Sequence, residues 1–413
     1  MPVSGPAAAR GDKPASTFDW AKILLNGALP LAGVLVALAI AGIFLALLKT
    51  DPMTAYGAMV DGALGSTFGL TMTLVKATPL LLVGLGICIA FRANVINIGA
   101  EGQIIMGALA GAIVPLSMPT APGWFLITAA CVAGFASGAL WGFIPGILKA
   151  KMRVNEILST IMMNAIALQF MNFLLQGPLM DPENVKRGTF LAQSARIPQQ
   201  AWLPRLVPQT LLHAGLILAL VLAVVVYIFL WRTTIGYEIR AVGLNPDASR
   251  YSGISVPYNV ALSLTLAGGF AGLAGVVEVI GVQHRLMDGL TSGYGFTGIV
   301  AALLGGLHPL GLIPASIFFG GLLVGADKMQ RAVQIPSALV TAILGMVVLL
   351  VSGAGIWARR WSAKRLAGGR RPAAGAPPDG SQRVAAFPPP GGSQGAATAD
   401  SPAAGDSAIG AKS

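Results

Sequence analysis

Apolar runs of about 20 residues recur along this chain, and they restrict its fold more than any other feature. A helix of that length crosses a hydrocarbon core of about 30 Å. Hydrophobic residues make up 55% of the 413 residues and charged residues only 10%, whereas soluble domains carry about a quarter charged residues. A transmembrane barrel would instead need alternating segments of about ten residues, which the sequence lacks. The sequence therefore predicts an all-α fold, a polytopic transmembrane helical bundle.

The predicted bundle has about ten spans, some of them broken or short. They lie near 27–48, 70–91, 96–116, 123–148, 155–175, 211–231, 257–281, 293–307, 310–326 and 334–353. Gly or Pro interrupts several spans, which leaves the count open by one or two. The glycine-rich segment 305–311 predicts a tight turn between two short spans. Gly268, Gly272 and Gly275 have the small-residue spacing of a helix-packing face.

The distribution of Lys and Arg predicts that both termini are cytoplasmic. With ten spans, the side that holds both termini carries 18 of the 27 basic residues, and the opposite side carries 8. Basic residues accumulate in cytoplasmic loops. Without the tail, the side that holds the termini carries 10 basic residues and the opposite side carries 8. The basic residues behind the net charge of +11 lie between spans and in the tail, where they face anionic lipid. We therefore expect the lipid bilayer, and no nucleic acid, as a partner.

Composition divides the chain into three parts. Residues 1–26 are polar and basic and form a predicted cytoplasmic N-terminal arm, and 27–353 form the transmembrane domain. Within that domain, 176–210 is the longest external loop, and its five prolines favour an extracytoplasmic cap. The tail 354–413 begins with a basic cluster that would lie at the membrane surface. Its remainder is rich in Ala, Gly, Pro and Ser and cannot bury a core, so we expect it to be disordered.

One long polar interruption, residues 232–256, separates two apolar spans. It is charged and punctuated by glycine, and it is long enough to form a short helix outside the bilayer. The charge distribution assigns it to the cytoplasmic side. A helix held there by a membrane protein would serve as a contact for another protein.

The segment 91–103 brings amides, an acid and two glycines between two spans, and it leaves two interpretations open. In the first, Asn94, Asn97, Glu101 and Gln103 belong to a broken helix start that lines a solute pathway, where polar groups are tolerated at membrane depth. In the second, the segment is a cytoplasmic turn, with Asn97 capping a helix and Glu101 near the positive end of that helix.

A second polar segment follows the predicted turn at 149–154. Asn155 is placed to cap the next span, and Glu156 would lie in its first turn. Ser159, Thr160 and Asn164 would hydrogen-bond between helices. The alternative is that Asn155 and Glu156 add a cytoplasmic contact to a partner protein.

Two ionisable residues fall within the predicted spans. An acid inside a membrane is a functional hypothesis by default, and Glu278 lies near the outer end of its span. The simpler interpretation is that Glu278 reaches the interface or pairs with His284 or Arg285. Lys76 would extend its amine toward the membrane surface.

The sequence offers no chemistry of its own. It contains no G-x-x-x-x-G-K-[ST] phosphate loop, so we do not expect the chain to hydrolyse ATP by that route. No Ser/His/Asp or H-E-x-x-H arrangement is present. The three histidines lack metal-ligand spacing, and Cys88 and Cys131 resemble small buried hydrophobes. We expect no catalytic residue, no metal and no cofactor, and therefore not an enzyme.

Three sequence blocks carry a resemblance to a known family. They are Asn97-Ile-Gly-Ala-Glu-Gly-Gln103, Val154-Asn-Glu-Ile-Leu-Ser-Thr-Ile-Met-Met-Asn164, and Gly236-Tyr-Glu-Ile-Arg-Ala-Val-Gly-Leu-Asn-Pro246 with Ser252-Gly-Ile254. The chain resembles the membrane permease subunit of bacterial ABC importers of the branched-chain amino acid/ribose/simple-sugar class. It is most similar to the nucleoside and simple-sugar permeases. The resemblance covers about 65–355 and leaves out the arm and the tail.

The resemblance implies that 232–256 is a coupling region that docks into the ATPase subunit. The residues that match are Gly236, Glu238, Arg240, Gly243, Asn245, Pro246, Arg250 and Gly253. The family pattern opens on an acid followed by two alanines, whereas this chain has Arg240-Ala-Val-Gly243. The missing acid leaves the helix and its glycine as the transferable parts.

The resemblance also implies the assembly and the cargo. The expected partners are an ABC ATPase subunit, a second homologous permease and an extracytoplasmic substrate-binding lipoprotein. The expected location is the bacterial cytoplasmic (inner) membrane, with many passes. The expected solute is a nucleoside, whose polar contacts could include Asn94, Asn97 and Gln103. A simple-sugar permease, an ion-driven secondary transporter and a non-transporting scaffold remain as alternatives.

Overall fold

The computed structural model describes residues 20–336 apart from 48, 187 and 190, together with single positions at 342, 345, 346, 349, 350 and 353. Three predicted parts therefore lie wholly or mostly outside the described residues: most of the arm 1–26, most of the span 334–353 and the whole tail 354–413. Residues 20–26 do not belong to an arm, because the first helix already begins at Trp20.

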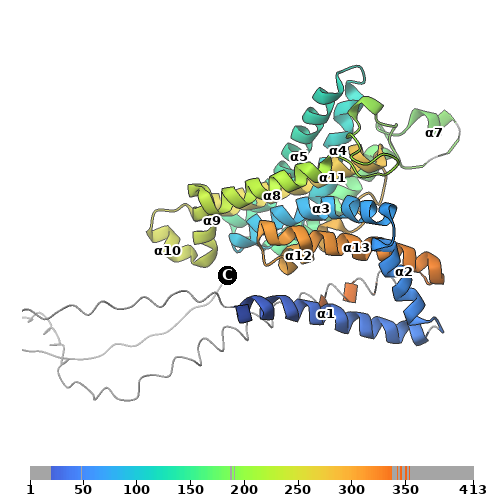
Figure 1. Ribbon diagram of the computed structural model, residues 1–413. Coiled ribbons are helices and arrows are strands. Elements are labelled where there is room, and N and C mark those ends of the chain that lie inside the picture. Colours follow the sequence, from blue (N-terminus) through green and yellow to red (C-terminus); the bar gives the residue numbers. More distant parts are fainter. Residues whose placement is uncertain are drawn as a thin grey trace, which may run out of the picture. The chain divides into compact units, whose positions relative to one another are not determined.

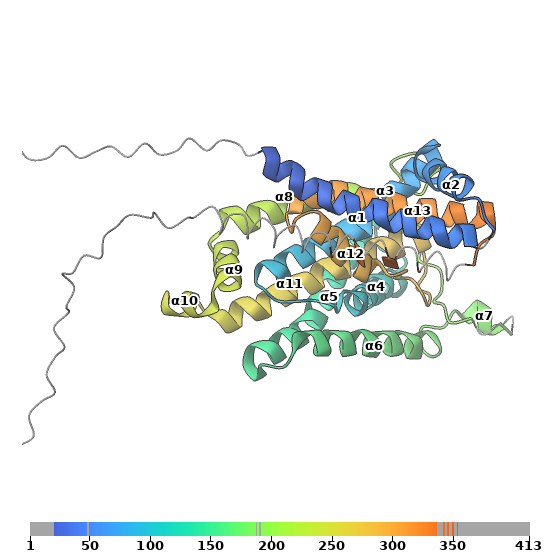
Figure 2. The same cartoon turned by 90° about the horizontal axis from the view of Figure 1, so that it is seen from below.

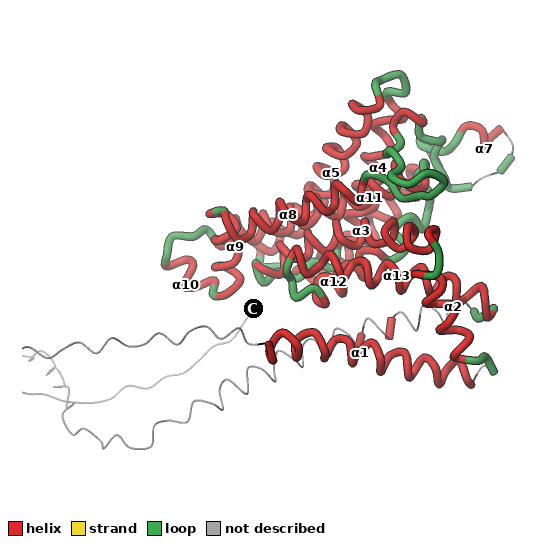
Figure 3. Tube along the Cα trace, viewed as in Figure 1, coloured by secondary structure: helices red, strands yellow, loops and turns green. Residues whose placement is uncertain are grey.

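The described chain is helical; most of its helices are joined by short turns, and a longer, largely irregular connection joins α6 to α8 (Figures 1 and 3). The helices are α1 Trp20–Leu47, α2 Pro52–Leu64, α3 Thr67–Arg92, α4 Ala100–Ser117, α5 Gly123–Met152, α6 Glu156–Leu175, α7 Pro182–Lys186, α8 Gly215–Arg232, α9 Thr234–Leu244, α10 Pro246–Tyr251, α11 Val256–Glu278, α12 Tyr294–Leu304 and α13 Pro309–Val333. A 3-10 turn, Gln199–Ala201, and a π-helical turn, Val279–Gln283, complete the set. The predicted all-α fold is confirmed.

Seven helices in the described part of the chain are long and apolar enough to cross a membrane, namely α3, α4, α5, α6, α8, α11 with its π-helical turn, and α13. Each matches a predicted span. The predicted span 293–307 is too long, because α12 has only 11 residues. The helix α2 was not predicted from the sequence; it begins where Asp51 accepts hydrogen bonds from the backbone N–H groups of Met53 and Thr54.

The centre of the bundle consists of α11 and α3, whose spanning segments are 78% and 83% buried, whereas α6 is only 17% buried. Glycines let α11 approach its neighbours closely. A Cβ atom on Gly268 or Gly272 would lie 2.2 or 2.3 Å from a backbone oxygen of α5, and one on Gly275 would lie 2.1 Å from the Ile104 oxygen of α4. The predicted packing face is therefore confirmed. Figure 2 shows α11 between α3 and α5.

The predicted turn between the two short spans is present. The chain leaves α12 at Gly305, and Gly306 and Leu307 have left-handed backbones with φ of 70° and 55°. His308 then caps α13, since its Nδ1 accepts a hydrogen bond from the Leu310 N–H over 3.3 Å. The short helix α12 thus ends in a tight turn, from which the long helix α13 continues. The helix α12 packs against α3 and α13.

The segment 176–214 covers one end of α8 and α11. Backbone hydrogen bonds join Ser194 to Leu286 over 2.9 Å and Leu203 to Ile280 over 3.1 Å. The Trp202 ring stacks on His284 with a centroid distance of 3.8 Å. The helices α9 and α10 lie at the opposite end, because α8 runs into α9 and α10 leads into α11. The two longest polar connections are thus separated by the length of a span.

Candidate functional site

The polar interruption 232–256 folds as two short helices, α9 and α10, which meet at Asn245. Thr233 begins α9, since its hydroxyl accepts a hydrogen bond from the Gly236 N–H over 3.1 Å. Asn245 ends α9 and also begins α10, where its side-chain oxygen accepts from the N–H groups of Asp247 and Ala248, each over 3.1 Å. Pro246 occupies the first turn of α10, where no N–H is needed.

One face of α9 is held tightly against the spans. Ile239 and Val242 are buried. A Cβ on Gly236 would lie 2.0 Å from the Phe229 oxygen of α8, and one on Gly243 would lie 1.9 Å from the Arg92 oxygen of α3. Both glycines are therefore required by close packing, and α9 follows any movement of these two spans.

A buried polar contact fixes α9 to a third span. Asn259 in the first turn of α11 is fully buried, and its Nδ2 donates to Glu238 Oε2 over 3.0 Å. Hydrogen bonds to a charged group contribute about 1.5–3 kcal/mol. Glu238 is thus an internal anchor of α9, not an outward contact.

The opposite face exposes large apolar side chains. Tyr237, Leu244 and Tyr251 are 61%, 88% and 95% exposed. Monomeric soluble surfaces rarely gather such side chains unless they mark an interaction site. The remaining matching residues also lie on this outer side: Asn245, Pro246, Arg250 and Gly253 are all exposed. The eight residues matched by the resemblance therefore divide into an inner set and an outer set.

Arg240, the fourth member of the inner set, takes part in an aromatic and cationic group that we call the Trp231 cluster: Trp231, Arg92, Arg240, Tyr227 and His308. The guanidinium groups of Arg92 and Arg240 lie 5.2 and 5.7 Å from the Trp231 ring centre. Such cation–π contacts contribute about 0.5–2 kcal/mol. The His308 ring lies 4.9 Å from that of Trp231.

The Trp231 cluster joins α9 to the turn between α12 and α13. Arg92 donates from Nε and Nη2 to the Leu307 oxygen over 3.2 and 3.1 Å. Leu307 and His308 both belong to that turn. The sequence analysis missed Trp231 and Arg92 as functional residues. The available signal was an aromatic residue at the end of the span before the interruption, but its cationic neighbours come from distant segments.

Asn155 and Glu156 have local contacts. Asn155 caps α6 as predicted, accepting from the Ile157 N–H over 2.9 Å, and its side chain is exposed. Glu156 forms an ion pair with Lys149 of α5 over 2.6 Å. Asn164 joins α6 to the start of α4, because it accepts from the Gly102 N–H over 2.8 Å and donates to the Ile98 oxygen over 2.9 Å. The predicted bonding between helices is confirmed for Asn164.

Three of the four predicted pathway residues come together at the start of α4. Asn97 and Gln103 are buried, and Asn97 Nδ2 donates to Gln103 Oε1 over 2.9 Å. The expected cap was wrong, because Gly99, not Asn97, directly precedes the helix. Asn94 is exposed, with a left-handed backbone at φ 58°, and does not join the group.

Glu101, the third of these residues, turns toward another helix. It lies in the first turn of α4, but its carboxylate accepts from the Gly295 N–H of α12 over 2.9 Å. The start of α4 is therefore joined to the start of α12. The start of α4 is thus buried in protein, and the pathway interpretation of these residues stays a prediction.

The two ionisable residues within the spans differ from their predictions. Lys76 does not extend to the surface, because its Nζ donates to the Tyr294 hydroxyl over 2.8 Å. Glu278 is buried and accepts from Gln283 Nε2 over 3.3 Å. His284, a predicted partner of Glu278, instead stacks on Trp202.

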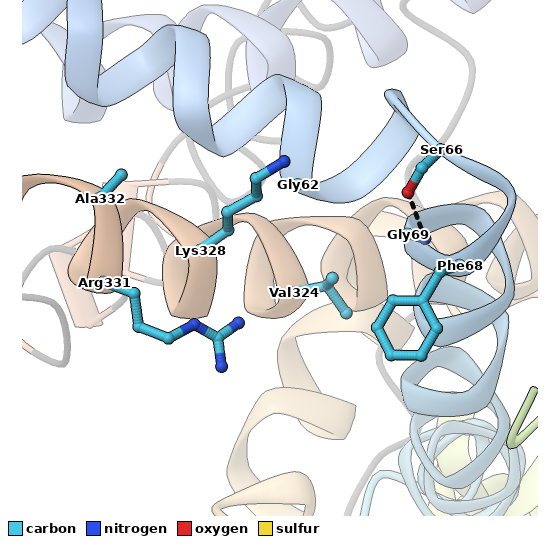
Figure 4. A pocket seen from close by; sticks show the side chains of 8 residues that line it. All are labelled: Gly62, Ser66, Phe68, Gly69, Val324, Lys328, Arg331 and Ala332. Atoms are coloured by element: carbon cyan, nitrogen blue, oxygen red, sulfur yellow. Dashed lines mark hydrogen bonds between the residues drawn. The ribbon is translucent and has the colours of Figure 1, made fainter.

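A pocket of about 470 Å³ lies between α2, the start of α3 and the end of α13 (Figure 4). Phe68, Val324 and Arg331 face it, and Ser66 closes one side by accepting from the Gly69 N–H over 3.0 Å. Lys328 forms an ion pair with Asp61 of α2. Since α13 begins at the Trp231 cluster and ends here, the pocket is distant from α9.

Comparison with known proteins places these features in context. A family model described as the branched-chain amino acid transport system permease component matches residues 69–352. The guanosine ABC transporter permease protein NupP of Bacillus subtilis is 36% identical over 324 residues, covering 78% of this chain and 92% of that protein. The glucose ABC transporter permease protein TsgB13 of Haloferax volcanii is 38% identical over 332 residues, with 78% and 86% covered. The nucleoside ABC transporter permease protein NupB of Lactococcus lactis is 33% identical over 329 residues, with 78% and 90% covered. No solved structure matches the chain.

Proposed function

Since this chain belongs to the branched-chain amino acid transport system permease component family, we propose that it carries nucleosides inward across the membrane, driven by ATP hydrolysis on a separate ATPase subunit. It is a multi-pass membrane protein and the permease subunit of an ABC importer, a transport subunit and not an enzyme. Family membership removes the ion-driven carrier and the non-transporting scaffold from consideration.

The observation that carries the proposal is the two-sided construction of α9 and α10. In the proposed mechanism the exposed side chains of Tyr237, Leu244 and Tyr251 enter a groove of the ATPase subunit. The outer residues Asn245, Pro246, Arg250 and Gly253 surround that contact. Asn155 is retained as an additional contact because it is exposed, whereas Glu156 is engaged with Lys149.

Movement of the ATPase would then pass to the spans through the inner face of α9. Gly236 and Gly243 transmit it to α8 and α3 by direct backbone contact. Glu238 transmits it to α11 through Asn259, and Arg240 transmits it through Trp231 toward the turn at Leu307. A rigid element whose position two sites can bias is the physical requirement for coupling.

Nucleosides are the proposed cargo because NupP and NupB, two of the similar permeases, carry guanosine or nucleoside in their names. TsgB13 favours a simple sugar as the second candidate. A nucleoside needs amide and hydroxyl partners for its polar groups. We propose that the buried amides of Asn97 and Gln103 at the start of α4, which bond to each other in this structure, exchange that contact for the solute.

The proposed assembly contains two permeases, the ATPase subunit and an extracytoplasmic substrate-binding lipoprotein in a bacterial inner membrane. The family implies the ATPase and the binding protein. A second, non-identical permease is proposed because one Bacillus strain has two guanosine permease proteins, NupP and NupQ, that are both similar to this chain. In this assembly 176–210 faces the binding protein and 232–256 faces the ATPase.

The test is uptake by the complete complex in liposomes, with the binding protein outside and ATP at the ATPase side. Labelled guanosine and uridine are compared with ribose and glucose. We expect ATP-dependent uptake of the nucleosides and little uptake of the free sugars. Uptake of a free sugar alone would show that the protein is a sugar permease. Uptake without ATP would contradict the ATP-driven mechanism.

A further inference from the structure

The starting observation is a group of ionisable and polar side chains in the middle of the membrane domain. Lys76 lies nine residues after the start of α3 and sixteen before its end, so it is about 14 and 24 Å from the two helix ends at a rise of about 1.5 Å per residue. Its ammonium group bonds to Tyr294, which is 1% exposed. Glu278, which is 3% exposed, is buried in the same region, although no hydrogen bond or ion pair joins it to Lys76 in the described chain.

These groups continue the polar contacts at the start of α4. Asn97 bonds to Gln103, and Glu101 of the same helix bonds to the Gly295 N–H. Gly295 follows Tyr294, which bonds to Lys76. We call this set of side chains the polar track: Asn97, Gln103, Glu101, Tyr294, Lys76, Glu278 and Gln283. It draws on α3, α4, α11, the π-helical turn and α12.

The hydrogen bonds of the polar track leave capacity for another molecule. An ammonium group has three donors, and a carboxylate can accept about four hydrogen bonds. Within the described chain Lys76 donates one bond, to Tyr294, and Glu278 accepts one, from Gln283. A structural network gains most when every member is satisfied. Charged groups at membrane depth that remain partly unsatisfied mark a solute pathway.

The backbone around the polar track is irregular. The π-helical turn Val279–Gln283 directly follows Glu278, and such turns occur often at functional sites. Between this turn and Tyr294 the chain has no regular helix, and the 11 residues of α12 are too few to cross a bilayer. Irregular backbone is tolerated at membrane depth only where it is buried in protein or lines a water-filled cavity.

We infer that Lys76, Tyr294 and Glu278 form a polar contact site in the solute pathway, and that they bind ring hydroxyl groups of an uncharged solute. Lys76 and Tyr294 supply donors, and Glu278 supplies acceptors. The opposite charges of Lys76 and Glu278 offset each other, so the site does not select an anion or a cation. The hydroxyl groups belong to the ribose of a nucleoside or to a free sugar. The inference rests on the proposed function for its choice of solutes.

Thiol labelling tests the inference in the complete complex. Cys88 is fully buried, so Cys131→Ser gives a suitable background. Lys76→Cys is compared with Thr78→Cys on the same helix, because Thr78 is fully buried and bonds only to its own helix at Leu74. A charged, membrane-impermeant methanethiosulfonate is applied in the ATP-free and the ATP-bound, vanadate-trapped state.

We expect Lys76→Cys to react at least ten times faster than Thr78→Cys in one of the two states. Guanosine or glucose, each supplied with the binding protein in a separate arm, should slow that reaction, and the arm that does so identifies the source of the hydroxyl groups. Equally slow reaction of both variants in both states would overturn the inference. Gln283→Cys provides the same measurement if Lys76→Cys fails to insert.

A transport measurement separates this inference from the proposed function. Tyr294→Phe removes the hydroxyl but keeps the ring, and Glu278→Gln removes the charge but keeps the shape. We expect each to lower solute uptake at least fivefold while ATP hydrolysis stays within twofold of the unmodified complex. Wild-type uptake in both variants would overturn the site. Absence of ATP-driven uptake in the unmodified complex would overturn the proposed function, while the labelling result would still decide the inference.

Discussion

The α9–α10 region and the polar track are both rich in polar groups, but they are built in opposite ways. The α9–α10 region comes from one continuous segment, caps itself through Thr233 and Asn245, and turns large side chains outward. The polar track is gathered from distant segments and turns inward around Tyr294. The difference agrees with the two proposed roles, because a coupling element needs a contiguous rigid segment, whereas a solute contact site needs groups from several helices.

The largest expected effect tests whether α9 must lie directly on α3. In Gly243→Ala the added methyl group would lie 1.9 Å from the Arg92 oxygen, so α9 must move away. Overpacking costs about 1–3 kcal/mol, which corresponds to roughly a five- to 150-fold loss of ATP-driven uptake. The matched control is Gly57→Ala, where the new methyl group meets nothing within 4 Å. Uptake near wild type in Gly243→Ala would break the comparison, because α9 would then not need its fixed position.

An intermediate effect is expected at the Trp231 cluster. Trp231→Leu keeps an apolar side chain but removes the ring that both guanidinium groups face. Two cation–π contacts of about 0.5–1 kcal/mol each predict about a five- to thirtyfold increase in ATP hydrolysed per solute transported. Trp124→Leu is the control, since Trp124 is 73% exposed on α5. An unchanged ratio in Trp231→Leu would leave α9 connected to the spans through its glycines and Glu238 alone.

The smallest expected effect is a loss of stability at acidic pH, and it concerns the end of the molecule that is opposite to α9 and α10. Burial lowers the pKa of His284 to about 4, helped by the positive charges of Arg196 and Arg205. The ordinary pKa of histidine is about 6.5, so below that pH the unfolded chain binds a proton that the folded chain excludes. Stability is therefore complete above about pH 6.5 and declines as the pH falls toward 4.

Melting temperatures at pH 7.5, 6 and 5 check this expectation. The unmodified protein should lose more stability on acidification than His284→Phe, whose ring can still stack on Trp202. His213, whose pKa burial lowers to about 4, remains in the variant, so a smaller acid dependence should persist. Identical curves would show that the segment 176–214 does not depend on a neutral His284.

The sequence predicted the helices that are long and apolar, because a span needs only length and hydropathy. It missed α2, whose 13 residues are too few to stand out as a span and which begins at an Asp51 cap. It also extended the span at 293–307 beyond the 11 helical residues of α12. Hydropathy alone does not distinguish a short helix that follows an irregular apolar segment from a helix that spans the whole membrane.

The candidate sites were predictable to the extent that they are local. Asn155 was recognised as a cap because its partner is two residues away. The identity of the residues that hold α9 was only partly predictable: the family resemblance pointed to Gly236 and Gly243, but not to the atoms they approach. Lys76 and Glu278 were given surface partners because their true neighbours, Tyr294 and Gln283, are set by tertiary packing.

The glycine contacts of α11 restrict how this protein can move. Along α11, backbone atoms of α4 and α5 lie so near that not even one methyl group fits at Gly268, Gly272 or Gly275. Interlocked main chains cannot slide past one another without first separating, so these three helices should travel as a single body. Opening must then occur along seams made of side chains, such as the one where α12 meets α3.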